Sequence, residues 1–289
     1  MDKEMRQSKD YKFIPMTSLR DRLGEEVTED VFYYTDQIAN IIFIGLEQSK
    51  EWFLIDAGMP YGASEIIETA QKRFGMGSRP LAIMLTHGHF DHVGGLIELI
   101  DTWQVPVYAH PLEAPFLTGK QDYPKPDHTV EGGMLAKISA IYPHESLDIG
   151  DALKPLPENG EVPYLSEWRW IHTPGHAPGH VSFFRERDGL LIAGDAFVTV
   201  KQDSFYNVLM QRAEVNGPPV YLTTDWQKAK QSVEQLAQLP IEIAITGHGP
   251  AMHGEDLREG LNQLVHQFDE KAIPSYGKFI DRNKDELEH

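Results

Sequence analysis

The stretch Thr86-His87-Gly88-His89-Phe90-Asp91-His92 follows a short apolar run and places three imidazoles and one carboxylate within six positions. Neutral imidazoles and ionised carboxylates are both good metal ligands. His87 and His89 are two residues apart, so on an extended backbone their side chains point to the same side. Asp91 and His92 fall where a helix is expected to begin, and the turn there can aim them at a neighbouring point. The stretch therefore predicts two ligands for each of two metal ions.

The composition limits the kinds of protein that this chain can be. Its 289 residues include no cysteine, which excludes disulfides and thiolate zinc sites and fits a cytoplasmic protein. The net charge of −18 argues against a nucleic-acid partner, because phosphate backbones are bound by basic surfaces. No apolar run approaches the length of a membrane span, and the polar N-terminus lacks a secretory signal. We expect a small-molecule substrate and no membrane partner, and a homodimer stays open.

Apolar runs and helical periodicities alternate along most of the chain. The runs at 40–45 and 51–56 predict a hairpin. The other expected elements are strands at 81–85, 105–109, 168–171, 181–184, 190–193 and 242–246, and helices at 64–74, 93–103, 224–239 (capped by Thr224) and 254–271. The proline-rich residues 111–164 predict an insertion or lid, with a helical segment near 134–142. We expect residues 1–286 to form a single domain and Leu287–His289 to be an expression-tag remnant.

Several of the predicted strands end directly at a metal-capable side chain. In layered α/β proteins, sites gather where strand ends open into loops, so these ends predict one convergent site. The candidate metal ligands are His87, His89, Asp91, His92, His176, Asp195 and His248. Five imidazoles and two carboxylates suffice for two metal ions with open positions for water.

Four motifs in this order resemble those of the metallo-β-lactamase superfamily of hydrolases. They are HGHFDH at 87–92, TPGHAPGH at 173–180, GDAF at 194–197 and GHGP at 247–250. The resemblance covers roughly residues 30 to 270. It implies an α/β fold, namely a four-layer αβ/βα sandwich with two mixed β-sheets, so that the expected single domain is a metallo-hydrolase domain.

The same resemblance implies a role for each candidate ligand. His87, His89 and His176 would hold one metal ion. Asp91, His92 and His248 would hold the other, and Asp195 would bridge the two. Zinc is the first expectation for both divalent ions, with iron or manganese as alternatives. Asp56 would support a histidine ligand through a hydrogen bond.

The implied reaction is hydrolysis of an ester, thioester or lactone. A metal-bridging hydroxide would attack the carbonyl, and a metal ion would stabilise the developing oxyanion. Asp91 and Asp195 are the expected catalytic residues, with Asp91 orienting the water or carrying its proton. The lid, with Tyr123, Pro124, Pro126 and Tyr142, would wall an apolar pocket and set the substrate, so its removal should leave metal content intact.

Alternatives remain for individual histidines. The stretch at 87–92 has a polar surface turn as its simplest alternative. His176 competes with His172 and His180 in the same loop, and the TPGH pattern favours His176. His180 is then expected to be a structural or supporting histidine, and His172 a strand-end side chain.

Alternatives also remain for the activity. Asp91 and the absence of cysteine argue against antibiotic hydrolysis. Glyoxalase II thioesterases share the TPGHxxGH loop. Quorum-quenching lactonases share the seven ligands but usually have a tyrosine a few residues beyond the bridging aspartate, where this chain has Val198 and the nearest tyrosine is Tyr206. A mononuclear iron enzyme resembling persulfide dioxygenases and a non-catalytic metal-binding protein are the two other classes.

Overall fold

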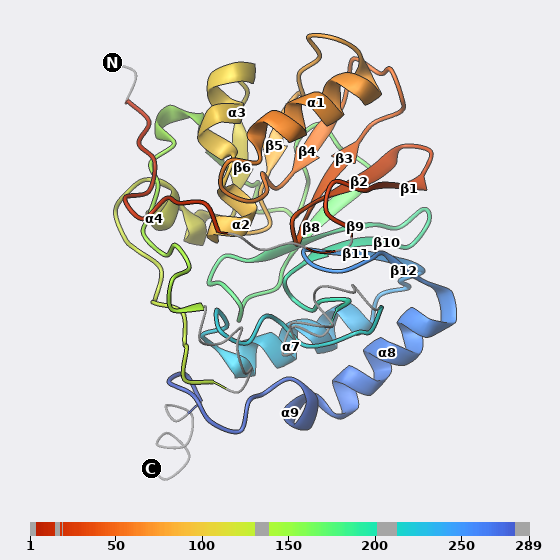
Figure 1. Ribbon diagram of the computed structural model, residues 1–289. Helices are drawn as coiled ribbons and strands as arrows, with labels where there is room; N and C mark the ends of the chain where they lie inside the picture. The colour runs from red at the N-terminus through yellow and green to blue at the C-terminus, as the bar shows by residue number, and fades with distance from the viewer. Residues whose placement is uncertain (1–3, 15–17, 19, 131–138, 201–212, 281–289) are drawn as a thin grey trace. The chain divides into compact units, whose positions relative to one another are not determined.

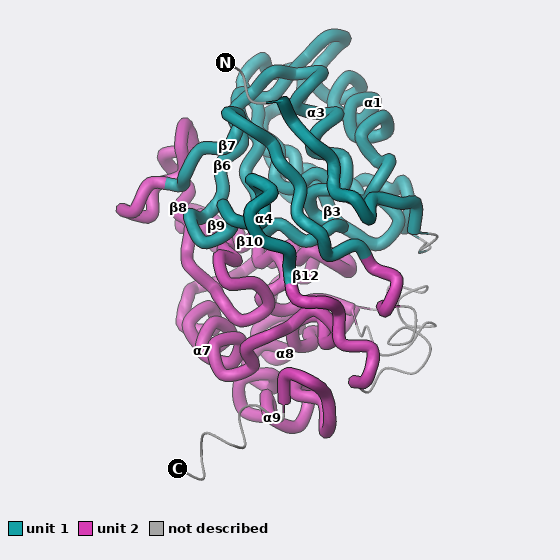
Figure 2. The backbone as a smooth tube through the Cα atoms, turned by 90° about the vertical axis from the view of Figure 1, so that its left-hand side faces the viewer, with its two compact units in different colours: residues 1–123, 143–156 teal, residues 124–142, 157–289 magenta. Residues whose placement is uncertain are grey.

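The computed structural model describes residues 4–14, 18, 20–130, 139–200 and 213–280 (Figure 1). The chain divides into two compact units. Unit 1 comprises Met1–Tyr123 and Pro143–Leu156, and unit 2 comprises Pro124–Tyr142 and Pro157–His289 (Figure 2). Most of the predicted helical segment near 134–142 and all of 287–289 lie outside the described residues. The single domain expected over 1–286 stays a prediction.

Unit 1 contains a seven-stranded sheet whose strands follow one another in chain order. These strands are β1 (Gly24–Thr28), β2 (Val31–Asp36), β3 (Ala39–Ile44), β4 (Phe53–Ile55), β5 (Ile83–Met84), β6 (Val107–Ala109) and β7 (Leu153–Pro155). Neighbours from β1 to β4 are antiparallel, and those from β4 to β7 are parallel, so the sheet is mixed. The pairing of β3 with β4 confirms the predicted hairpin. The edge strand β1 (GEEVT) lies in a region for which no element was predicted, because its polar composition carries little strand signal.

Two helices pack their apolar faces on this sheet, α1 (Ala63–Phe74) and α3 (Leu96–Trp103) (Figure 1). The helix predicted at 93–103 is interrupted, because a short helix α2 (Phe90–Val93) ends at Gly94 before α3 begins. A Cβ on Gly94 would lie 2.2 Å from the backbone of Met59, so only glycine permits this close approach. Shorter helical turns in this unit are η1 (Pro111–Glu113), α4 (Ala114–Leu117) and η2 (Gly150–Ala152).

Unit 2 contains a five-stranded mixed sheet in the order β12-β11-β10-β9-β8. Its strands are β8 (Trp168–His172), β9 (Val181–Arg185), β10 (Leu190–Gly194), β11 (Ile243–Thr246) and β12 (Met252–His253). Strands β10 and β11 are parallel and the other neighbours are antiparallel. The strands predicted at 168–171, 181–184, 190–193 and 242–246 are thereby confirmed to within one or two residues at each end.

The helices of unit 2 that the described residues contain in full are α7 (Trp226–Ala237), α8 (Gly254–His266) and α9 (Phe268–Lys271). The apolar faces of α7 and α8 pack on the sheet strands in one core. The predicted cap at Thr224 is wrong, since the side chain of Asp225 accepts the hydrogen bond from Lys228 N and caps α7. Within the described parts of the chain, no helix is long and apolar enough to cross a membrane.

Candidate metal centre

Unit 1 places four of the predicted ligands on one turn of chain. The stretch at 87–92 begins beyond the carboxyl end of β5 and runs into α2, where His89 is the extended N-cap residue. His87, His89, Asp91 and His92 are each at most 5% exposed, which excludes the surface-turn alternative. The His87 ring lies 4.6 Å from the His89 ring and 4.2 Å from the His92 ring, measured between centroids.

A buried aspartate fixes the orientation of two of these imidazoles. Asp56 follows β4, and its Oδ2 accepts hydrogen bonds from His92 Nδ1 (2.8 Å) and from the Thr86 hydroxyl (2.7 Å). Because the Thr86 hydroxyl donates its proton to Asp56, its oxygen accepts from His87 Nδ1 at 3.1 Å. Both rings therefore carry their proton on Nδ1 and offer Nε2 to a metal ion. The predicted hydrogen bond between Asp56 and a histidine is thus present, and its role in supporting a metal ligand stays a prediction.

Unit 2 places the other three predicted ligands beyond three different strands. His176, Asp195 and His248 follow β8, β10 and β11, and each is at most 3% exposed. The Nε2 atom of His176 lies 3.4 Å from Asp195 Oδ2, and the Nε2 atom of His248 lies 3.3 Å from that same oxygen. One carboxylate oxygen thus has an imidazole nitrogen on either side.

The hydrogen bonds around His176 indicate that this arrangement suits a cation. The Thr223 hydroxyl donates to the carbonyl of Pro219 (2.7 Å), so its oxygen accepts from His176 Nδ1 at 3.1 Å. The lone pair on His176 Nε2 then faces the Asp195 carboxylate, and two acceptors face each other. A metal ion ligated by both groups removes this repulsion, so the donor set fits a divalent metal. All seven predicted ligands belong to groups of histidine and aspartate side chains that could hold a metal ion.

The two competing histidines have other partners. His180 Nε2 accepts the backbone N–H of Asp195 (2.8 Å), and His180 Nδ1 lies 2.8 Å from the Thr173 hydroxyl. His180 therefore holds the turn that carries Asp195, which confirms its predicted supporting role. His172 ends β8, and its Nε2 donates to the carbonyl of Pro178 (2.9 Å), as expected for a strand-end side chain.

Two residues of the predicted lid, Glu113 and Tyr123, form hydrogen bonds with the ligand stretch. No motif in the sequence predicted these hydrogen bonds. The backbone N–H of Gly88 lies 2.9 Å from Glu113 Oε2 and 3.1 Å from the Tyr123 hydroxyl oxygen. Glu113 closes η1, a place with no metal motif nearby, and Tyr123 was expected only as a pocket wall. The one available signal was a carboxylate that closely follows a buried strand.

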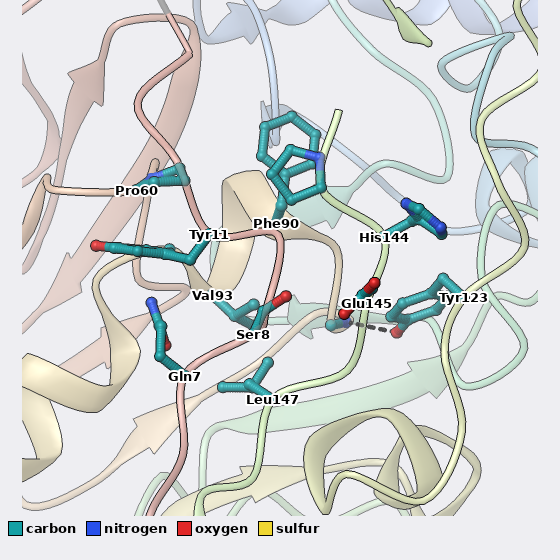
Figure 3. A pocket seen from close by; sticks show the side chains of 13 residues that line it. Gln7, Ser8, Tyr11, Pro60, Phe90, Val93, Tyr123, His144, Glu145 and Leu147 are labelled. Atoms are coloured by element: carbon teal, nitrogen blue, oxygen red, sulfur yellow. Dashed lines mark hydrogen bonds between the residues drawn. The ribbon is translucent and has the colours of Figure 1, made fainter. Parts of the chain in front are cut away.

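A cavity in unit 1 adjoins the ligand stretch (Figure 3). Its walls include Tyr11, Phe90, Val93, Tyr123 and Leu147. The N-terminal segment that covers it is held in place, because Asp10 accepts the backbone N–H groups of His144 and Glu145 and Tyr11 accepts that of Tyr61.

The lining residues bear on the predicted pocket. Gly88 and Phe90 line the cavity, whereas the four candidate ligands of the stretch do not, so the cavity adjoins the stretch without being lined by its imidazoles. Of the four lid residues expected to wall a pocket, Tyr123 lines this cavity, while Pro124, Pro126 and Tyr142 belong to unit 2. Tyr206 lies outside the described residues, and Val198 is buried and pairs with Asn216.

Sequence comparison connects this arrangement with known proteins. A family model described as the metallo-β-lactamase superfamily matches residues 34–248. The protein named "Probable metallo-hydrolase YflN" of Bacillus subtilis is 46% identical over 256 residues, which are 88% of this chain and 97% of the relative. A hydroxyacylglutathione hydrolase of Xylella fastidiosa is 28% identical over 211 residues, which are 72% of this chain and 59% of the relative.

Solved structures give the same connection. The structure of TTHA1623 in a di-iron-bound form is 27% identical, with a TM-score of 0.51, and the match covers 74% of this chain and 89% of that one. The structure of the BLEG-1 B3 metallo-β-lactamase is 26% identical, with a TM-score of 0.53, and the match covers 79% of this chain and 91% of that one.

Proposed function

Because the chain belongs to the metallo-β-lactamase superfamily of metallo-hydrolases, we propose that it hydrolyses an ester, thioester or lactone with the help of two divalent metal ions. The family match confirms the resemblance drawn from the four motifs, and with it the predicted α/β fold class with two mixed sheets. The observation that carries the proposal is the Asp195 carboxylate oxygen flanked by two imidazole Nε2 atoms.

We assign the ligands as the resemblance implies. His87, His89 and His176 would hold one ion, Asp91, His92 and His248 would hold the other, and Asp195 would contribute to both. Support for a shared Asp195 comes from His176 and His248, whose Nε2 atoms approach the same Oδ2. Support for the unit 1 ligands comes from the Nδ1 hydrogen bonds that leave Nε2 of His87 and His92 as the metal-binding atoms.

Bound divalent ions supply a hydroxide nucleophile at neutral pH and polarise the carbonyl under attack. The chain's own residues do the rest. Asp56 and Thr223 keep three imidazoles in the tautomer that binds through Nε2. His180 fixes the backbone at Asp195. In this proposal Asp91 orients the attacking water. Its carboxylate takes up the proton that this water loses and holds it until the leaving group accepts it.

Similar proteins support particular choices of substrate and metal in this proposal. A hydroxyacylglutathione hydrolase acts on a thioester, and its similarity to this chain supports thioesters as substrates alongside esters and lactones. Zinc is our first assignment for the metal, since histidine with carboxylate is a common zinc ligand set. The di-iron form of TTHA1623 supports iron as the alternative. Asp91 and the absence of cysteine argue against antibiotic hydrolysis, and a β-lactam serves as a comparison substrate because BLEG-1, which this chain resembles, is a B3 metallo-β-lactamase.

Elemental analysis of protein purified without added metal, followed by a substrate panel, tests the proposal. We expect two divalent ions per chain and turnover of at least one thioester, lactone or aryl ester, with a β-lactam in the same panel. One iron per chain together with oxygen consumption would instead identify a dioxygenase. Retained metal without turnover of any panel member would identify a metal-binding protein.

A further inference from the structure

Glu113 and Tyr123 meet the backbone at the centre of the ligand stretch. The N–H of Gly88 donates to Glu113 Oε2 (2.9 Å) and to the Tyr123 hydroxyl oxygen (3.1 Å). Figure 3 shows the second of these hydrogen bonds at the edge of the cavity. The Tyr123 hydroxyl in turn donates to the same Glu113 oxygen. Each of the three groups is thus hydrogen-bonded to the other two. The peptide N–H among them is that of Gly88, which lies between two predicted ligands, His87 and His89.

The cost of burying this pair argues against simple packing. Glu113 is fully buried, and a buried carboxylate costs several kcal/mol unless hydrogen bonds compensate for the lost water. Apolar side chains of similar size would fill the same space without that cost.

The shape of the contact is as specific as its polarity. The Tyr123 ring stacks on Phe116 with centroids 3.9 Å apart, and it also lies 4.5 Å from the His89 ring. A Cβ at Gly88 would lie 2.7 Å from the Tyr123 hydroxyl oxygen and 3.3 Å from Glu113 Oε2. Glycine at 88 is therefore what lets both acceptors reach the peptide N–H.

We propose that Glu113 and Tyr123 are positioning residues for the metal centre. They fix the Gly88 peptide, and this peptide sets the directions in which His87 and His89 leave the backbone. When the ligand stretch is already ordered before the metal binds, less of the metal-binding free energy is needed to order it. The inference rests on the proposed function in one respect, namely that His87 and His89 are metal ligands.

A positioning role of Glu113 and Tyr123 and a role in packing alone predict different effects of their loss on metal affinity. If the pair only packs, its loss lowers the free energy of unfolding but leaves the metal affinity of the folded protein unchanged. If it positions the stretch, the folded protein binds metal more weakly and with altered geometry. Metal affinity and the visible spectrum of the Co²⁺-loaded protein separate these cases without any activity measurement.

The experiment compares three conservative variants. Tyr123→Phe keeps the ring stack and removes the hydroxyl, and Glu113→Gln keeps the size and removes the charge. Tyr142→Phe is the matched control, because Tyr142 is another buried tyrosine of the 111–164 segment, and its ring packs 5.8 Å from Tyr221. Zn²⁺ and Co²⁺ affinities are measured by competition with a chromophoric chelator, on protein shown to be folded by circular dichroism.

We expect each of the first two variants to bind metal about 10- to 100-fold more weakly, the usual effect of losing a partner that orients metal ligands. Their Co²⁺ spectra should also change, while Tyr142→Phe should match wild type in both readouts. Unchanged affinity and spectrum in a folded Tyr123→Phe variant would overturn the inference, even if Glu113→Gln does not fold. A wild-type protein that binds no metal would overturn the proposed function itself. Metal binding without turnover would overturn only the proposed hydrolase activity.

Discussion

The two sets of candidate ligands are built in opposite ways. In unit 1 four ligands lie within 87–92, and residues distant in sequence hold that single stretch in place, namely Asp56, Glu113 and Tyr123. In unit 2 three ligands come from three strand ends, and two of them have a separate partner, namely Thr223 for His176 and His180 for Asp195. The unit 1 set therefore depends on the geometry of one loop, whereas the unit 2 set depends on the sheet that aligns its strand ends.

The sharpest test of the unit 2 set is Asp195→Ala. Because Asp195 Oδ2 is approached by both His176 and His248, its loss should remove most bound metal and lower activity on the order of 1,000-fold. Elemental analysis and turnover of the best panel substrate measure this. Asp269→Ala is the control, since Asp269 forms only an exposed ion pair with Lys230. Full metal content in the Asp195 variant would refute the shared-ligand assignment.

In unit 1 the largest effect is expected from Asp56→Asn. Asp56 accepts three hydrogen bonds, two from Thr86 and one from His92, and an amide cannot accept all three in the same geometry. Two imidazoles lose their fixed tautomer, so we expect metal affinity to fall about 100-fold. Chelator competition measures the change. An affinity within a factor of two of wild type would show that the stretch at 87–92 orders itself without Asp56.

The same contrast explains what could be predicted from the sequence. The unit 1 ligands are contiguous, so side-chain alternation and the onset of a helix were enough to nominate them. His176, Asp195 and His248 are separated by whole elements, so they were joined to one site by their place at strand ends, and the four-motif resemblance then supported that grouping. Glu113 could not be found, because its role depends on how the segment after β6 folds back onto Gly88. Helix ends were missed where glycine packing, as at Gly94, decides them.

The expectation that the lid acts independently of the metal also needs revision. The segment 111–164 was expected to set the substrate and leave metal content unchanged on removal. Glu113 and Tyr123 belong to that segment, and both bind the N–H of Gly88. Removal of the whole segment is therefore expected to loosen the ligand stretch, and changes in specificity are better sought at the cavity-lining His144 and Glu145.

Asp36, a second aspartate of unit 1, is expected to affect the stability of the fold but not metal binding. Burial raises the pKa of Asp36 to about 6, above its ordinary value of 3.8, although its Oδ2 accepts the backbone N–H of Met59. The folded state therefore binds the proton of the Asp36 carboxyl more tightly than the unfolded state does. The stability that this proton contributes is fully present below pH 4 and is lost as the pH rises through about 6.

Asp36→Asn removes this titration and serves as the control for Asp56→Asn. Its free energy of unfolding, relative to wild type, should rise by about 2 kcal/mol between pH 4 and pH 7, because one pKa unit corresponds to about 1.4 kcal/mol. Denaturant titrations at the two pH values measure this difference. Metal affinity should stay at the wild-type value, since Asp36 supports the loop at Met59 and none of the ligands. A loss of affinity comparable to that of Asp56→Asn would show that the stretch responds to any disturbance of unit 1.

Among the variants expected to weaken metal binding, the smallest loss of affinity is expected from Thr223→Val, the unit 2 counterpart of Asp56→Asn. Thr223 orients one imidazole, that of His176, through a hydroxyl that is itself fixed by the carbonyl of Pro219. Valine keeps the shape and removes the acceptor, so His176 can exchange its tautomer while Asp195 and His248 keep their positions. We expect metal affinity to fall about 10-fold, the lower end of the range for such partners, measured by the same chelator competition. Thr223→Ser, which restores the hydroxyl, should recover the wild-type affinity. A Thr223→Val defect as large as that of Asp56→Asn would mean that the unit 2 ligands also act as one coupled loop, and the contrast between the two sets would fail.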